Sequence, residues 1–154
     1  MTPAIPVRVL LRRGATAVAA GRVAIGLAAL ASPSLPARPW VGAAADDLAA
    51  SVFGRALGGR DLALGLGALE ALRRPDGEAS TWVAAGAISD ALDVAASALA
   101  WQRLPRGWRW LVVGSAGAAS CVGLAAAAYL RVRPLSTLPA AQSAAVHARV
   151  TPVP

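Results

Sequence analysis

The sequence predicts an all-α integral membrane protein, a bundle of four helices that cross the bilayer. Hydrophobic residues make up 56% of its 154 residues and the mean hydropathy is +0.55, which places the chain in the membrane class. The chain has five Trp but only one Phe and one Tyr, so its apolar residues are mainly Ala, Leu, Val and Gly. Small residues of this kind let membrane helices approach closely, whereas a soluble core depends on large side chains.

The first two predicted helices cover residues 14–31 and 52–72. Each has close to the roughly 20 apolar residues that are needed to cross about 30 Å of hydrocarbon. The first ends at a Ser-Pro-Ser-Leu-Pro stretch that starts at Ser32, and the second ends before an Arg-Arg-Pro sequence. A cleaved signal peptide with a small-residue site near Ala37 is an alternative for the first helix, but Arg22 divides its apolar stretch.

The third and fourth predicted helices cover residues 79–101 and 108–130. Tryptophan and tyrosine concentrate at membrane interfaces, so their positions test these boundaries independently. Aromatic residues of this kind lie near the helix ends and not at the helix centres: Trp82, Trp101, Trp108, Trp110 and Tyr129. The predicted membrane domain is therefore 1–133, and 134–154, which is rich in Ala, Ser, Pro and Thr, is expected to be a disordered tail.

Arginine positions predict the orientation in the membrane. With the N-terminus in the cytoplasm, the cytoplasmic side holds seven arginines: Arg8, Arg12, Arg13, Arg73, Arg74, Arg131 and Arg133. The other side holds four: Arg38, Arg103, Arg106 and Arg109. The positive-inside rule then places both termini in the cytoplasm. Arginine without any lysine, together with abundant alanine, is typical of GC-rich bacterial genomes, so we expect a multi-pass protein of the bacterial plasma membrane.

Several kinds of site are excluded or disfavoured by composition. The net charge of +7 is not arranged as a basic stripe with interleaved aromatics, so we expect lipid as the partner and no nucleic acid. Cys121 is the only cysteine, which excludes an internal disulfide and a Cys-x-x-Cys redox pair. His147 is the only histidine, which excludes haem ligation by paired histidines. We expect no metal site and no resident cofactor.

Charged residues inside the predicted helices form the candidate functional site. They are Arg22 in the first helix, Arg55, Arg60 and Asp61 in the second, and Asp90 and Asp93 in the third. A charge near the bilayer centre costs about 2.5 to 3.5 kcal/mol on insertion scales, so these side chains must face one another or water. From their depths we predict the pairs Arg60 with Asp90, Arg55 with Asp93, and Arg22 with Asp61.

Small and polar residues predict which helix faces pack together. On the second helix this face carries Gly54, Gly58, Asp61 and Gly65. On the third it carries Trp82, Gly86, Asp90, Asp93 and Ser97. On the fourth we expect a neutral packing surface of Gly114, Gly117 and Cys121.

Three short sequences carry a resemblance to a known family. They are Gly-Gly-Arg-Asp-Leu-Ala-Leu-Gly from Gly58 to Gly65, Gly-Arg at Gly21, and Asp-Ala-Leu-Asp from Asp90. With its Gly-x-Arg-Asp-x-x-x-Gly signature in the second helix, the chain resembles an uncharacterised family of small four-helix membrane proteins, common in actinobacteria and described as a domain of unknown function. The resemblance covers 14–130 and implies topology but no activity. A likeness to DoxX-type four-helix proteins rests on architecture alone.

Three functions are compatible with these features. The first is a non-enzymatic structural or accessory role, in which the arginines and aspartates fix the helix order, with a second copy or another membrane protein as partner. The second is a small transporter or proton-coupled permeation protein that uses the intramembrane aspartates, although their arginine partners favour permanent pairing. The third is a redox accessory of the DoxX kind, which would need a bound cofactor. The usual catalytic side chains are missing, so we do not expect an enzyme.

Overall fold

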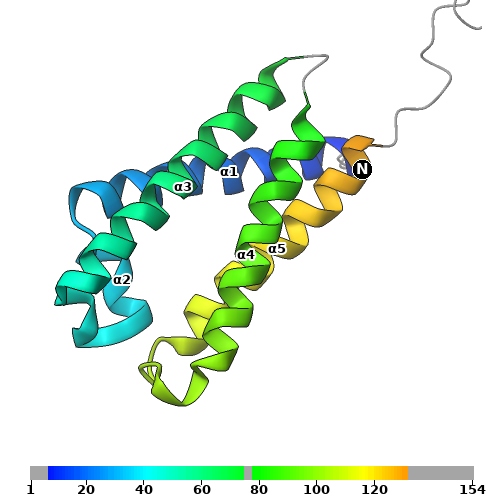
Figure 1. Ribbon diagram of the computed structural model, residues 1–154. Helices are drawn as coiled ribbons and strands as arrows, with labels where there is room; N and C mark the ends of the chain where they lie inside the picture. Colours follow the sequence, from blue (N-terminus) through cyan, green and yellow to red (C-terminus); the bar gives the residue numbers. More distant parts are fainter. Residues whose placement is uncertain (1–6, 75–77, 132–154) are drawn as a thin grey trace, which may run out of the picture.

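The computed structural model describes residues 7–74 and 78–131, and over these residues the chain is all-α, as predicted (Figure 1). The predicted tail, 134–154, lies outside the described residues. The elements are α1 (Val7–Ala31), α2 (Ser34–Val41), the 3-10 helix η1 (Gly42–Asp46), α3 (Leu48–Arg73), α4 (Ala79–Leu99), the 3-10 helix η2 (Trp101–Arg103) and α5 (Arg109–Arg131).

The four long helices cover the four predicted apolar runs and differ from them at the ends. α1 begins at Val7 and α3 at Leu48, both earlier than predicted, because the preceding residues are compatible with a helix although they are not all apolar. The Pro-rich segment after α1, predicted only as a break, forms α2. Pro33 and Pro36 lie at the start of α2, where a missing N–H leaves no helical hydrogen bond unmade.

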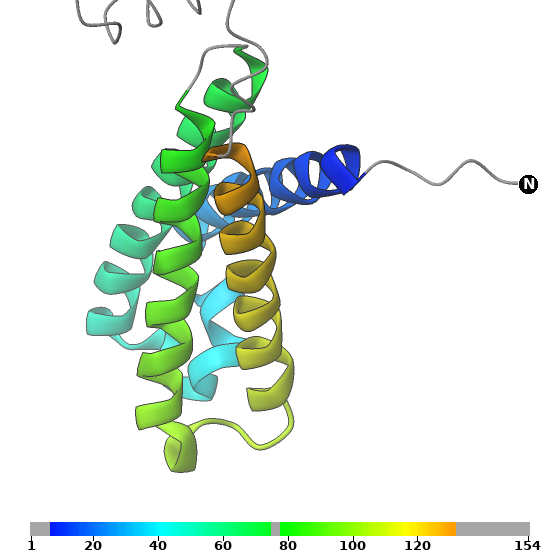
Figure 2. The ribbon, with the colours of Figure 1, turned by 90° about the vertical axis from the view of Figure 1, so that its right-hand side faces the viewer.

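The long helices form two antiparallel pairs, α1 with α3 and α4 with α5. In the first pair the backbones are in contact: a Cβ atom added to Gly26 would lie 2.7 Å from the Gly58 carbonyl oxygen and 2.7 Å from the Leu62 nitrogen. Figures 1 and 2 both show α1 crossing the other long helices obliquely. Close glycine contacts with an oblique crossing are typical of small-residue packing in membranes.

The distribution of side chains is the reverse of that in a soluble protein. The buried apolar residues are mostly alanines, and the described residues contain no large side chain that is less than 2% exposed. Large apolar side chains point outward, for example Phe53, Leu92 and Leu99, which are 68%, 63% and 93% exposed. An outer surface of this kind fits a lipid environment better than water.

Three helical segments are long and apolar enough to cross a membrane: Val9–Ala31, Ala79–Leu99 and Arg109–Arg131. They support the prediction of a membrane protein with transmembrane helices. α3 has sufficient length but is not one of them, and Arg55, Arg60 and Asp61 interrupt its apolar sequence.

Of the predicted packing face of the fourth helix, Gly117 does contact α4, since its Cβ position lies 4.0 Å from Val94 Cγ2. The predictions for Gly114 and Cys121 are wrong. A Cβ atom on Gly114 would meet nothing within 4 Å, and Cys121 is exposed. α5 instead packs through the buried residues Val112, Ala116, Ser120, Gly123, Ala126 and Ala127. Because α5 is rich in Ala and Gly on more than one side, glycine spacing alone could not identify the buried face.

We predict that Gly26→Ala lowers the free energy of unfolding by about 1 to 3 kcal/mol, because its Cβ atom meets backbone atoms of α3 that cannot rotate away. Gly21→Ala on the same helix is the matched control, since nothing lies within 4 Å of its Cβ position. Thermal unfolding in mild detergent measures both variants. Equal midpoints for the two would contradict the backbone contact between α1 and α3.

Candidate functional site, a buried arginine and aspartate network

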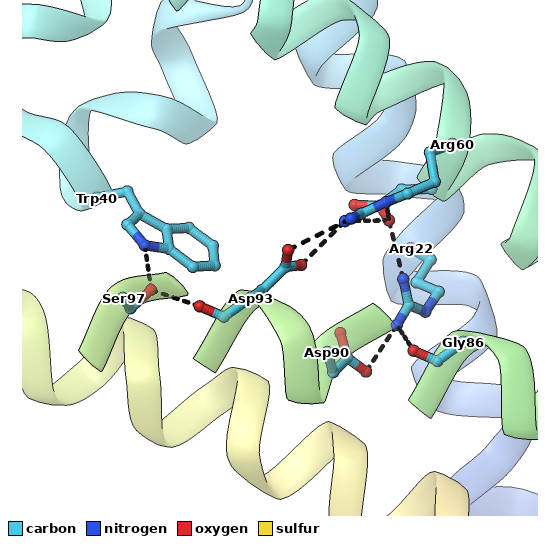
Figure 3. A network of polar contacts seen from close by, with 8 residues as sticks. Arg22, Trp40, Arg60, Gly86, Asp90, Asp93 and Ser97 are labelled. Atoms are coloured by element: carbon cyan, nitrogen blue, oxygen red, sulfur yellow. Dashed lines mark hydrogen bonds and ion pairs between the residues drawn. The ribbon is translucent and has the colours of Figure 1, made fainter. Parts of the chain in front are cut away.

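Five charged side chains from three helices meet between the two helix pairs (Figure 3). Arg22 comes from α1, Arg60 and Asp61 from α3, and Asp90 and Asp93 from α4. We call these five residues the charge network. It contains five of the six residues predicted as the candidate site.

Arg22 lies at the buried end of the network. Its side chain is 8% exposed, and its Nη1 donates a hydrogen bond to Asp61 Oδ1 at 2.8 Å. Its Nη2 lies 2.7 Å from Asp90 Oδ2 and also donates to the Gly86 carbonyl oxygen. Gly86 leaves room for this guanidinium, because a Cβ atom there would lie 3.1 Å from Arg22 Nε. Arg22 therefore joins α1 to both α3 and α4.

Arg60 lies at the more open end. Its Nη2 is 3.1 Å from Asp61 Oδ1 and 2.9 Å from Asp93 Oδ2. The Arg60 and Asp93 side chains are 32% and 25% exposed, compared with 16% for Asp61. Asp61 Oδ1 thus accepts hydrogen bonds from both arginines and lies at the centre of the network.

A further chain of hydrogen bonds connects α2 to the backbone of α4 beside the network. Ser97 donates from its hydroxyl to the Asp93 carbonyl oxygen at 2.6 Å, and Trp40 Nε1 donates to Ser97 Oγ at 2.8 Å (Figure 3). The sequence placed Ser97 on the same face as Asp93 but gave no partner for Trp40. The sequence did not predict α2. Without that helix, the direction of the Trp40 side chain could not be predicted.

Of the three predicted pairs, Arg22 with Asp61 is confirmed, and the other two are wrong. Arg60 pairs with Asp93 and not with Asp90, because Arg22 of α1 forms the ion pair with Asp90. Arg55 is exposed and donates to Ser51 Oγ at 2.6 Å. Five residues of an α-helix rotate a side chain by about 140°, so Arg55 points away from the face that carries Arg60.

Because Arg55 lies outside the charge network, the positive and negative charges of the network are unequal. Two arginines and three aspartates leave the network with one negative charge in excess, whereas three of each would cancel. Asp90 has one ion-pair contact: its Oδ2 is buried and lies 2.7 Å from Arg22 Nη2, in a geometry poorly aligned for a hydrogen bond. Asp61 and Asp93 each accept two hydrogen bonds or more.

A cavity of about 20 Å³ lies beside Arg22, between α1, α3, α4 and α5. Its other walls are apolar apart from backbone, and include Leu64, Trp82 and Val83. A space of this size holds about one water molecule. Within residues 7–74 and 78–131, no group of three or more His, Cys, Asp or Glu side chains is placed to hold a metal ion.

Comparisons of the chain with protein-family models, with curated proteins and with solved structures give no match. The candidate function therefore rests on the charge network and the outer surface.

We predict that Asp61→Asn lowers the free energy of unfolding by about 3 to 5 kcal/mol, because it removes the carboxylate that Arg22 and Arg60 share. Arg55→Gln, a charge removal on the same helix outside the network, should change it by no more than about 0.5 kcal/mol. Detergent unfolding followed by circular dichroism measures both. An Asp61→Asn variant as stable as Arg55→Gln would show that the network does not hold the helices together.

Proposed function

We propose that the chain is a multi-pass protein of the bacterial plasma membrane with a non-enzymatic structural or accessory role. Its four long helices cross the bilayer, and the charge network fixes their arrangement. The observation that carries this proposal is a set of ion pairs that join the two helix pairs: Arg22 of α1 lies 2.7 Å from Asp90 of α4, and Arg60 of α3 lies 2.9 Å from Asp93 of α4. Arg22 also pairs with Asp61 at 2.8 Å, within the α1 and α3 pair. Removing one member of such a set leaves an unpaired buried charge, so the set favours one arrangement over others.

The direction of the α3 charges supports its place as the fourth membrane helix. Arg60 and Asp61 face α1 and α4, where they find partners, and do not point outward at the helix centre. At 1.5 Å per residue, the 26 residues of α3 extend about 39 Å, which exceeds the hydrocarbon thickness. Arg55 is closer to the end of α3, from which a long side chain reaches the interface.

Among the arginine side chains that the structure describes, five lie at one end of the helices and four at the other (Arg38, Arg103, Arg106 and Arg109), a small bias in the direction of the positive-inside rule. The start of α1 and the ends of α3 and α5 lie at the same end of the molecule, and Arg12 donates to the Leu72 carbonyl oxygen there. The described arginines at this end are Arg12, Arg13, Arg73, Arg74 and Arg131. This distribution supports the placement of both termini in the cytoplasm.

A topology measurement tests the four crossings. In a Cys121→Ser background, Ala44→Cys lies before α3, Glu78→Cys after it, and Gln102→Cys after α4. We expect a membrane-impermeant maleimide added outside intact cells to label the cysteines at 44 and 102 but not the one at 78. The cysteine at 78 should react only after the cells are opened. Labelling of 44 and 78 from the same side would show that α3 does not cross.

The excess carboxylate supports a second candidate function, proton-coupled permeation. A fully compensated network has no charge to exchange, whereas this one carries one negative charge that a proton would neutralise. Asp90 is the residue that best fits this role, because it lacks a well-aligned donor and lies beside the cavity residue Arg22.

Proton flux separates the two candidates. Under the structural proposal, vesicles that contain the wild-type protein should retain an imposed pH gradient as long as empty vesicles do, measured with an entrapped fluorescent pH indicator. Rapid loss of the gradient with wild type, abolished by Asp90→Asn but not by the surface change Asp46→Asn, would overturn the structural role in favour of permeation.

A further inference from the structure

Tryptophan and arginine side chains gather in a short segment at the end of the bundle opposite the two termini of the helical domain. The segment comprises η2, the loop after it and the first residues of α5. Its tryptophans and arginines are Trp101, Arg103, Arg106, Trp108, Arg109 and Trp110, and we call this set the Trp-Arg loop.

The loop has a defined geometry. The guanidinium carbon of Arg109 lies 4.6 Å from the centroid of the Trp101 ring, within the range of a cation–π contact. Trp101 in turn packs edge to face against Trp110, with ring centroids 4.6 Å apart and an interplanar angle of 72°. Leu104 is buried, and the Pro105 carbonyl oxygen accepts backbone hydrogen bonds from residues 108 and 109. The arginines are therefore presented from an ordered backbone.

The positive charge of the loop has no internal counter-charge. None of Arg103, Arg106 and Arg109 forms an ion pair within the described residues, and the chain has no acidic residue after Asp93. The neighbouring Arg38 on α2 is different, because it pairs with Asp46 at 2.9 Å. Nε of Arg109 is also buried without a hydrogen-bond partner. Stacking on Trp101 thus fixes the position of the Arg109 guanidinium in the loop.

We propose that the Trp-Arg loop binds the phosphate headgroup of an anionic phospholipid in the adjacent leaflet. Arginine recognises phosphate through its terminal N–H groups, and the loop brings three arginines without an ion-pair partner among the described residues into one short segment. An apolar surface for the acyl chains of a lipid lies beside the arginines. It is formed by Trp108, Trp110 and Leu111, which are 51%, 71% and 61% exposed. Free phosphate would use the arginines but not this apolar surface. The inference rests on the bilayer insertion proposed above.

The test uses the full-length protein in nanodiscs of phosphatidylcholine with a minor fraction of phosphatidylglycerol. Native mass spectrometry measures the phosphatidylglycerol retained by wild type, by Arg103→Gln/Arg106→Gln/Arg109→Gln and by the control Arg13→Gln/Arg73→Gln/Arg131→Gln. The control removes the same charge from the opposite end of the bundle. Each arginine near an anionic surface contributes about 1 kcal/mol at either end of the bundle, so the control measures the loss that comes from charge alone. We expect the loop variant to lose at least about fivefold more affinity than the control, because only the loop arginines lie beside exposed tryptophans.

Each outcome decides the proposal. A larger loss in the loop variant than in the control supports a headgroup site, whereas equal losses in the two variants, or none, overturn it. Displacement of phosphatidylglycerol by millimolar inorganic phosphate would assign the site to free phosphate and overturn the lipid. If the triple variant does not fold, Arg109→Gln compared with Arg131→Gln gives the same contrast with one charge. Failure of wild type to enter nanodiscs would instead contradict membrane insertion.

Discussion

The ion pairs of Arg22 with Asp61 and Asp90 are the interaction on which the arrangement of the helices depends, because one arginine holds α1 to its partner α3 and also to α4 of the second helix pair. Arg60 with Asp93 is a second ion pair between the helix pairs, at the more exposed end of the network. Two glycine contacts make the ion pairs of Arg22 geometrically accessible. Gly26 lets α1 touch the backbone of α3, one turn beyond Arg22, and Gly86 leaves space for the guanidinium against α4. Bulk at either position would separate the charges and leave an arginine unpaired in a low-dielectric interior, which is more costly than losing a contact between apolar groups.

A core built from alanine explains why such a network is useful. Large core side chains specify a structure through their individual shapes, whereas Ala15, Ala19, Ala68 and Ala126 offer similar surfaces that can slide past one another. In lipid the hydrophobic effect does not drive one helix toward another, so packing and polar contacts select the arrangement. The charge network supplies directional contacts at one level of the bundle. The chain from Trp40 through Ser97 to Asp93 extends this selection to α2, the element without an apolar run of its own.

The long helices could be predicted from the sequence because arginine, proline and tryptophan mark their ends. The ion pair of Arg22 with Asp61 could be predicted because both residues lie at mid-depth on consecutive long helices. It was insufficient where rotation about a helix axis decides the outcome. Arg55 has a plausible depth for Asp93, but it lies about 140° around α3 from Arg60 and cannot face the same partner. The buried face of α5 was missed for a similar reason, since alanine and glycine surround that helix and no periodic pattern distinguishes Gly123 from Gly114. α2 was missed because proline marks helix starts as well as breaks.

Charge balance, more than burial, separates a structural role from a transport role in this network. A set of equal charges would hold the helices at the lowest electrostatic cost, and Arg55 is near enough along the sequence to have completed one. Its outward direction leaves three carboxylates for two guanidinium groups, with the most exposed pair, Arg60 and Asp93, at one end and Asp90 at the more enclosed end. Arg22 pairs with both Asp61 and Asp90, so neutralising Asp90 would weaken the link between α1 and α4 while leaving Arg22 with Asp61 and Arg60 with Asp93. The single excess carboxylate charge therefore lies where the two helix pairs meet, which is the place where the structural and the permeation proposals make different predictions for Asp90.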